Sequence, residues 1–234
     1  MEQRIAKIEA HTEQLLHLLI GAHTVFAMVR PMNVDEELVA RLSRESRGAG
    51  FGVIRHVLFW NLVQELVKIV ADKDDRVPSI RNLRNHLADP RVKAWFEDKY
   101  SVWASSAKAS DPPEAKEFWK HRNRQSELER REVFASIHER AMTESANLLD
   151  STELASMEEV RDKLLAHNEL KFQNGSYRFI DIGSYGLKYG DERKLLEKAT
   201  RVFDEFFLLV KQASFEWDRS KEMMEHDAKL FWKE

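Results

Sequence analysis

The sequence predicts an all-α protein, and its composition and the spacing of its apolar residues support that prediction. Charged residues make up 33% of the 234-residue chain, which contains only 8 glycines and 5 prolines. Apolar residues recur mostly at helical rather than alternating intervals. A chain of this length can bury a substantial core, and we expect one helical domain over residues 1–234.

Local signals divide the first third of the chain into helices. We expect a long amphipathic helix over 2–30, closed by Pro31, and a second helix of about a dozen residues capped by Asn33. Three glycines between 48 and 52 interrupt the helical pattern. The strongly apolar stretch over 53–71 then predicts a central bundle helix.

The middle of the chain carries clearer start and stop signals. Ser79 is expected to cap a short helix that ends near Asp89-Pro90, where the next helix begins. The run Ser110-Asp111-Pro112-Pro113 is the clearest break, and a long charged helix is expected to start on its second proline.

The last third is predicted to hold two helices and a turn. Asp150-Ser151-Thr152 caps a helix over about 152–169, and a final long helix is expected over about 191–230. Between them, Asn174-Gly175 is a tight-turn signal, which predicts a small β-hairpin near 170–182.

The most informative stretch lies near the end of the 152–169 helix. Arg161 falls among the apolar residues Leu154, Met157, Val160, Leu164 and Leu165, and His167 lies at the edge of the same stripe. A guanidinium cannot be buried without a partner at low cost. Arg161 is therefore expected either to pair with an acid on a neighbouring helix or to line a solvent-filled groove.

This stretch resembles the HEPN superfamily of helical ribonucleases, whose signature is an Arg, four to six residues and a His. The triplet Arg161-Asp162-Lys163 followed by Ala166-His167 is most similar to the abortive-infection, AbiU-like branch. An apolar helix ending at Asp72, with Ser79-Ile80 opening the next helix, looks like the same branch.

The resemblance implies a metal-independent endoribonuclease of toxin or phage-defence type, with RNA as substrate and no cofactor. Arg161 would stabilise charge on the phosphate, and His167 would transfer protons as acid or base. Asp162, Lys163 and Asn168 would support them. On a regular helix Arg161 and His167 lie ~120° and ~9 Å apart, so the resemblance implies a homodimer in which two motif helices surround one phosphate.

Other interpretations of the same residues stay open. Arg161 is also able to form a structural ion pair with Glu205 or Glu65, and His167 to cap its helix. The protein would then be a noncatalytic HEPN-like protein that binds RNA or a protein partner, or a plain dimeric scaffold.

The Arg–His spacing by itself is weak evidence, because three other pairs in the chain satisfy it. They are Arg81 with His86, Arg131 with His138, and Arg219 with His226. Of these, the pair on 81–86 is the runner-up, since a polar residue follows its Arg, as is common in the superfamily.

Composition excludes several other classes of protein. The chain has no cysteine, which rules out disulfides and thiolate metal sites, and its net charge of −3 gives no global basic field. His11, His17 and His23 recur every six residues and cannot converge on a metal from one helix. We expect no metal site, no membrane span, a cytoplasmic location and, for a toxin, an antitoxin or other inhibitor as partner.

Two further surfaces are considered, one for contact with RNA and one for contact with a second copy of the chain. A basic run over 120–131, beside Trp119, is more typical of a solvated helix face than of an RNA-guiding surface. The tail carries more apolar surface than a free end needs and is a candidate for packing across a dimer; the residues concerned are Trp217, Met223, Met224, Phe231 and Trp232.

Overall fold

A computed structural model of the chain describes residues 1–44, 48–102, 112–166, 170–173, 176–179 and 185–233. Side chains are described for these residues except 44 and 164–179. The helices are α1 (Glu2–Val34), α2 (Glu36–Arg44), α3 (Gly48–Ala71), α4 (Ile80–Leu87), α5 (Pro90–Ser101), α6 (Pro113–Leu149), α7 (Thr152–Val160), the π-helical η1 (Arg161–Ala166), α8 (Asp191–Lys211) and α9 (Trp217–Lys233). The predicted all-α class is confirmed.

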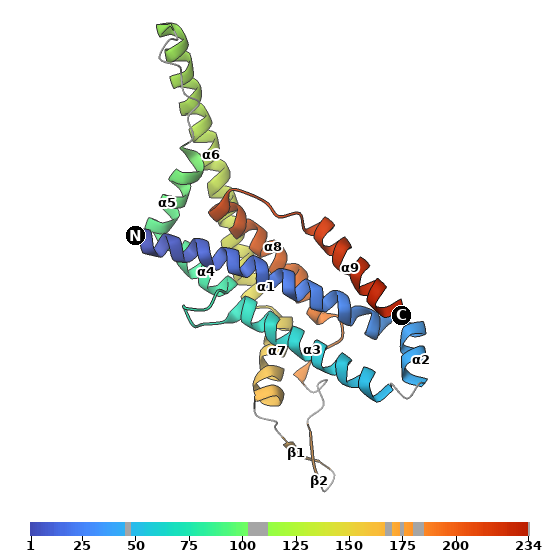
Figure 1. The fold of residues 1–234 in the computed structure, drawn as a ribbon. Helices are drawn as coiled ribbons and strands as arrows, with labels where there is room; N and C mark the ends of the chain where they lie inside the picture. The colour runs from blue at the N-terminus through green and yellow to red at the C-terminus, as the bar shows by residue number, and fades with distance from the viewer. Residues whose placement is uncertain (45–47, 103–111, 167–169, 174–175, 180–184, 234) are drawn as a thin grey trace.

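The core lies where α1, α3 and α8 pack together, with α4, α6 and α7 around them (Figure 1). Its largest fully buried side chains include Phe96, Phe134, Phe203 and Phe206, contributed by α5, α6 and α8. Burial of aromatic side chains of this size contributes a large share of folding free energy. One apolar cluster therefore joins helices from both halves of the chain.

In the described part of the chain, α1 is the one helix whose length and composition would allow it to cross a membrane. Length and composition alone do not make this helix a membrane span, because a buried core helix has the same properties. Ile8, Leu15 and Leu19 on this helix are nevertheless fully buried, and α1 packs against α3, α8 and α9. A central position in the bundle accounts for its apolarity.

The boundary between α1 and α2 differs from the prediction. α1 does not stop before Pro31 but continues through it to Val34, and the backbone N–H of Asp35 donates to the Pro31 carbonyl. Asp35 rather than Asn33 caps α2, because its Oδ1 accepts from the Leu38 N–H at 3.0 Å. A proline removes one helical hydrogen bond, and the buried side chain of Met32 keeps the last turn docked.

Other helix starts agree with the sequence signals, with one exception. Ser79 Oγ accepts from the Asn82 N–H at 3.1 Å, and Asp89 accepts from the Arg91 N–H at 2.8 Å, as expected for N-caps. α6 begins on Pro113, as predicted. The exception is α3, which already begins at Gly48, so the glycines there open the helix rather than precede it.

The segment after α6 ends in a two-stranded sheet. The regular helix predicted over 152–169 ends at Val160 and gives way to η1. Strands β1 (Leu170–Gln173) and β2 (Ser176–Phe179) pair antiparallel, with Leu170 opposite Phe179, and extend away from the bundle beyond α7 (Figure 1). The turn residues Asn174 and Gly175 lie outside the described residues.

The prediction of one final helix over 191–230 was wrong. α8 ends at Lys211, Gln212 takes the left-handed conformation with φ 55°, and α9 begins only at Trp217. The connection is held in place because Trp217 is buried and its indole N–H donates to Asp204 of α8. No Gly or Pro marks this break, so local signals did not predict it.

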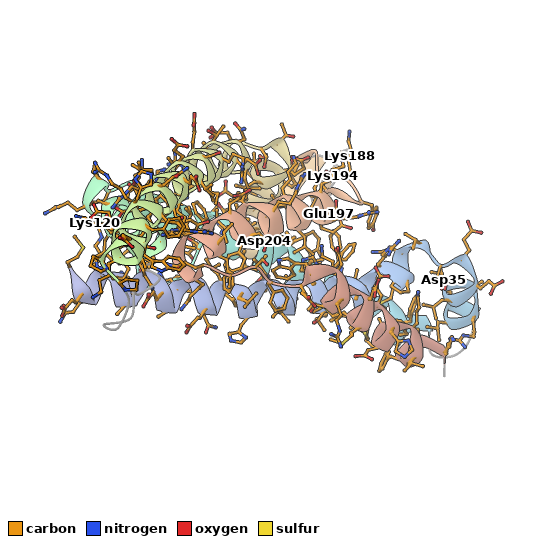
Figure 2. The ribbon with its side chains drawn as sticks, turned by 90° about the horizontal axis from the view of Figure 1, so that it is seen from above. Asp35, Lys120, Lys188, Lys194, Glu197 and Asp204 are labelled. Carbon is orange, nitrogen blue, oxygen red and sulfur yellow. The ribbon has the colours of Figure 1, made fainter. Side chains whose placement is uncertain are left out.

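The molecule is elongated because α6 is much longer than its neighbours. The N-terminal half of α6 extends past the bundle (Figure 1), and Lys120 on this half lies at the opposite end of the molecule from Asp35 (Figure 2). Phe118 and Leu128 on the same half are more than half exposed. The α7 segment lies on another side of the bundle, beside α3.

Candidate active site

The motif segment begins on α7 and continues into η1. Leu154, Met157 and Val160 are fully buried and hold α7 against the core. After Val160 the backbone changes to the wider i→i+5 winding over Arg161–Ala166. Such π-turns are rare and occur frequently at functional sites. The Arg-Asp-Lys triplet therefore starts where the regular helix ends.

Arg161 lies partly exposed at the start of η1. Its side chain is 34% exposed, Nε donates to Asp162 Oδ1 at 2.8 Å, and Nη2 lies 2.7 Å from the same oxygen. The Asp162 side chain itself is 60% exposed. This adjacent carboxylate orients the guanidinium and leaves part of it open to solvent.

The structural ion pairs that the sequence left open for Arg161 do not form. Glu65 pairs with Lys68 at 2.9 Å, and Glu205 accepts from Arg140 Nη2 at 2.9 Å. Both carboxylates are therefore paired with other cationic side chains. Arg161 does not tie α7 to a neighbouring helix among the described residues.

Lys163 follows on the same turn. Its ammonium pairs with Glu159 at 2.6 Å and lies 5.3 Å from the centroid of the Tyr185 ring. Tyr185 lies in the segment before α8 and was missed by the sequence analysis. An aromatic residue between Gly183 and Gly186 is nevertheless a signal that the sequence offers.

Two glycines with positive φ shape the segment 185–190, and one of them lies beside α7. Gly186 has φ 75°, and a Cβ added there would lie 3.4 Å from the Ser156 hydroxyl on α7. Gly190 has φ 97° and occupies the N-cap position of α8. Both backbone conformations favour glycine. This segment brings Tyr185 next to Lys163 of the motif turn and Tyr189 next to Phe59 of α3.

Ionisable groups at the start of α8 reinforce the same junction. Lys198 of α8 contacts Glu153 of α7 at 3.0 Å; the Glu153 backbone N–H, and then this ammonium, lower the pKa of the Glu153 carboxyl. Burial raises the pKa of Glu192, whose carboxylate accepts from the Gly190 N–H at 2.8 Å. The loop, α7 and α8 thus form one interconnected unit around the motif.

His167 and Asn168 lie outside the described residues. The structure therefore places Arg161, Asp162 and Lys163 together on one turn, and the approach of His167 to Arg161 stays a prediction. The backbone of the motif is described up to Ala166 and resumes at Leu170.

Two of the competing Arg–His pairs have structural roles. Arg81 Nε donates to the Ala71 carbonyl at 3.0 Å, and burial, with the nearby Arg4 and Lys7 cations, lowers the pKa of His86. Such a histidine is neutral over a wider pH range than an exposed one.

The second of these pairs lies on α6. Arg131 contacts Asp98 at 2.7 Å and Glu127 at 2.9 Å, and His138 Nε2 donates to the Leu87 carbonyl at 3.0 Å. Both side chains thus join α6 to its neighbours.

The third competing pair is exposed. Arg219 and His226 lie on the solvent side of α9. They have no structural context that resembles the motif turn, and they provide a natural control for it.

The remaining polar clusters give no metal site. Among the residues that the structure describes, no three His, Cys, Asp or Glu side chains lie close enough to hold a metal ion. His11 contacts His86, and His23 contacts Thr200, so these two histidines point to different partners. In the basic run on α6, Arg122 lies 5.9 Å from the Trp119 ring centroid.

Comparison with protein-family models gives a match over nearly the whole chain. A family model described as AbiU2, of the HEPN group, matches residues 5–231, which is nearly the whole chain. No curated protein and no solved structure matches the sequence.

Proposed function

Because the chain belongs to the AbiU2 family of HEPN proteins, we propose that it is a metal-independent endoribonuclease of the abortive-infection or toxin type. The observation that carries this proposal is the position and exposure of the Arg161 side chain. Its guanidinium lies at a π-turn, is held by the adjacent Asp162 and is partly open to solvent. An arginine that only stabilised the fold would be expected to tie this turn to another element.

The proposed chemistry uses the 2′-hydroxyl of RNA as nucleophile. Attack of this oxygen on phosphorus forms a 2′,3′-cyclic phosphate and breaks the bond to the departing 5′ oxygen. His167 removes the 2′ proton or protonates the 5′ oxygen. Arg161 presents a planar fork of donors to the phosphate oxygens and stabilises the charge that develops there.

The supporting residues have distinct proposed roles. Asp162 holds the Arg161 guanidinium in one orientation through the bonds described above. Lys163 contacts phosphates beside the scissile one, although Glu159 partly neutralises it in the free protein. Asn168 would contact a neighbouring phosphate or base.

We propose that the active form is a homodimer, with the two copies meeting beside η1. An exposed apolar ridge lies on α3, where Val53 is 63%, Ile54 49% and Val57 56% exposed. Tyr189, 77% exposed, contacts Phe59 of the same helix with ring centroids 5.8 Å apart. Because α3 packs against α7, a second copy seated on this ridge would bring two motif turns near each other.

The cleavage test uses purified protein, single-stranded RNA and EDTA. We expect RNA cleavage that Arg161→Ala and His167→Ala each reduce by about 100-fold or more. Arg161→Lys should recover little activity, since an ammonium lacks the planar fork. The matched controls Arg219→Ala and His226→Ala should retain full activity. Cleavage that survives both motif substitutions would refute the site.

The noncatalytic alternative gives a different result in the same experiment. It predicts salt-dependent RNA binding without cleavage by the unmodified protein. A third result, neither binding nor cleavage, would favour a scaffold. If cleavage is found, an inhibitor such as an antitoxin is the expected cellular partner.

The dimer is tested by Val57→Glu, which places a charge on the exposed ridge. Because Val57 is exposed, this change should lower the folding stability of the monomer only slightly. We expect light scattering to show a fall from dimer to monomer mass, together with loss of cleavage. Val133→Glu is the matched control, because Val133 is 49% exposed on α6. An unchanged mass with full activity in Val57→Glu would overturn this interface.

A further inference from the structure

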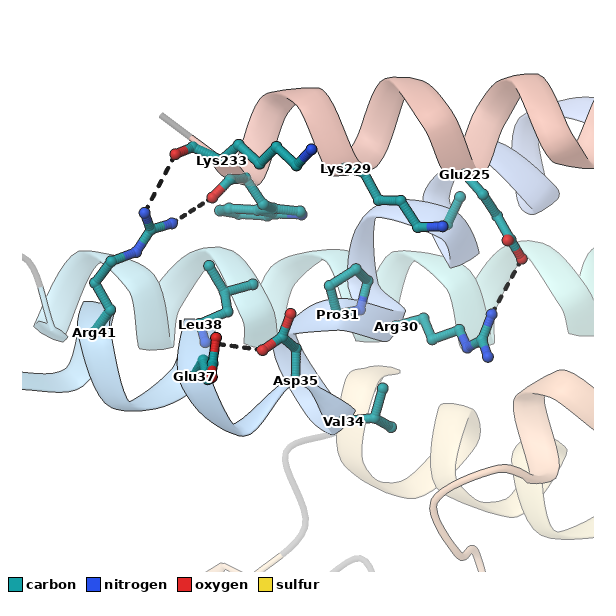
Figure 3. Close-up of a pocket in the computed structure, with 12 residues that line it drawn as sticks. Arg30, Pro31, Val34, Asp35, Glu37, Leu38, Arg41, Glu225, Lys229 and Lys233 are labelled. Carbon is teal, nitrogen blue, oxygen red and sulfur yellow. Dashed lines mark hydrogen bonds and ion pairs between the residues drawn. The ribbon is translucent and has the colours of Figure 1, made fainter.

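A cavity of about 560 Å³ lies between the end of α1, α2 and α9 (Figure 3). Its apolar wall is formed by Ala27, Pro31, Val34, Leu38 and Trp232. Its volume is within the range of ~300–1,000 Å³ that small-molecule sites in proteins occupy. The cavity shares no lining residue with the motif turn.

The charged groups at the two ends of the cavity hold its walls in place. Arg41 of α2 donates to the carbonyl of Lys233 at 3.3 Å and to that of Trp232, and thereby caps the end of α9. Arg30 of α1 pairs with Glu225 of α9 at 3.1 Å (Figure 3). Both guanidiniums are therefore engaged by the protein and bridge α9 to α1 and α2.

Lys229 is different from these two arginines. It lies on α9 between the residues that these arginines bind, Glu225 and Trp232. Its side chain is directed toward α1 and the cavity (Figure 3). No acidic partner lies within ion-pair distance of it in the described part of the chain. This ammonium is available to bind an anionic group of a ligand.

The part of the cavity wall formed by α1 and its C-cap offers hydrogen-bond acceptors. Pro31 has no N–H, so the carbonyl of Ala27 lacks its usual helical donor. Asp35 uses Oδ1 to cap α2, which leaves its second carboxylate oxygen for another donor. These oxygens favour a ligand that carries N–H or O–H groups.

The indole of Trp232 completes the site. Its Nε1 donates to the Met28 carbonyl at 3.1 Å, and its ring meets Phe51 edge-on with centroids 6.2 Å apart. A side chain fixed from two directions forms a rigid aromatic part of the wall. Rigid aromatic surfaces suit planar ligand groups.

We infer that this cavity binds a nucleoside 5′-monophosphate. The ligand must combine an anion for Lys229, an apolar or planar body for the wall, and hydrogen-bond donors for Asp35 and the Ala27 carbonyl. Inorganic phosphate would leave the apolar wall uncovered, and a fatty acid would leave the acceptors unpaired. A base, a ribose and a phosphate together meet all three requirements.

The experiment is isothermal titration of the full chain with AMP, GMP, CMP and UMP, and with inorganic phosphate and the parent nucleosides as separate probes. We expect saturable binding of at least one monophosphate, and weaker binding of its nucleoside and of phosphate. Lys229→Met should weaken binding by about 10- to 100-fold, because it removes a charge-assisted hydrogen bond. Lys221→Met, eight residues earlier on α9 and outside the cavity, should leave binding unchanged.

A second variant tests the cavity without altering charge. Val34 is 67% exposed at the cavity wall, so Val34→Trp should block the cavity while the fold remains, and Val34→Ala should not. A nucleoside monophosphate could also bind at the motif turn as a reaction product. Binding that persists in Arg161→Ala would show that the monophosphate binds in the cavity instead. Absence of binding up to about 1 mM, or binding unaffected by Lys229→Met and Val34→Trp, would overturn the inference.

Discussion

Two arginines in this molecule, each followed by a histidine at similar spacing, lie in opposite surroundings. Arg81 on α4 donates to the last carbonyl of α3, and Asn82 beside it is buried with its amide donating to the carbonyls of Asp74 and Val77 at 2.7 and 2.8 Å. Arg161 at the end of α7 forms its hydrogen bond and ion pair with its neighbour Asp162, and with no other described residue. The two Arg–His pairs share their spacing, but only Arg81 binds a backbone group of another helix.

This difference shows why an Arg–His pattern does not identify a site by itself. On α4 the side chains of Arg81 and Asn82 donate to backbone carbonyls that folding would otherwise leave without a donor. At η1 the backbone departs from the regular helix and the guanidinium stays partly in solvent. The predictions below test whether the packed positions are structural and the motif turn is not.

The largest expected effect is acid destabilisation through histidines of the packed interior. Burial, aided by the Lys221 cation, lowers the pKa of His23 from 6.5 to about 4. Thr200 donates its hydroxyl to the Leu196 carbonyl, so His23 Nε2 carries the proton in their 2.9 Å hydrogen bond. The folded state therefore holds a neutral His23 over a range where the unfolded chain is protonated.

The sign follows from that difference in protonation. Above pH 6.5 both states are neutral at His23 and its contribution is complete; as the pH falls toward 4 the unfolded state gains a proton first, and stability is lost. The loss from His23 amounts to on the order of 3 kcal/mol. Urea denaturation between pH 7 and 4 measures it. His23→Gln should flatten the dependence, and an equal slope in that variant would exclude His23 as the cause.

The next effect concerns Asn82. Asn82→Ala removes both hydrogen bonds to the 72–79 loop and leaves two carbonyls without their donors, so we expect a loss of about 2–3 kcal/mol in unfolding free energy. Asn85→Ala, at an exposed position of the same helix, should change stability by less than ~0.5 kcal/mol. Similar values for the two variants would contradict the structural role of Asn82.

The contrast between these regions also explains which features the sequence predicted. Local chemistry determined the starts at Ser79, Asp89-Pro90 and Pro113, because a cap or a proline acts on the residues next to it. The Arg-Asp-Lys triplet was likewise identified from adjacent residues. Features of this kind need no knowledge of the tertiary fold.

Features that depend on tertiary contacts were missed. Pro31 stays inside α1, where the buried Met32 docks the last turn, and the break after Gln212 is held by Trp217 and Asp204. Burial raises the pKa of Asp204, which no sequence pattern indicates. The π-turn at 161–166 has the same apolar spacing as an α-helix over so short a stretch, so periodicity alone did not reveal it.

A smaller effect is expected for Arg81→Met, which keeps the apolar stem and removes the guanidinium. The C-terminal carbonyl of α3 loses its donor at 3.0 Å, and we expect a loss of about 1–2 kcal/mol. Chemical denaturation monitored by circular dichroism gives the value. RNA cleavage per folded molecule should be unchanged, since Arg81 is outside the proposed site.

The smallest stability effect is expected for Arg161→Met, the matched substitution at the motif turn. A partly exposed pair with an adjacent carboxylate is worth less than ~1 kcal/mol, so the unfolding free energy should fall by less than in Arg81→Met. An arginine that contributes little to stability but is required for cleavage has its energetic role in the reaction rather than in the fold. If Arg161→Met instead destabilises the protein as much as Arg81→Met and leaves RNA cleavage intact, the two arginines are equivalent and Arg161 is structural.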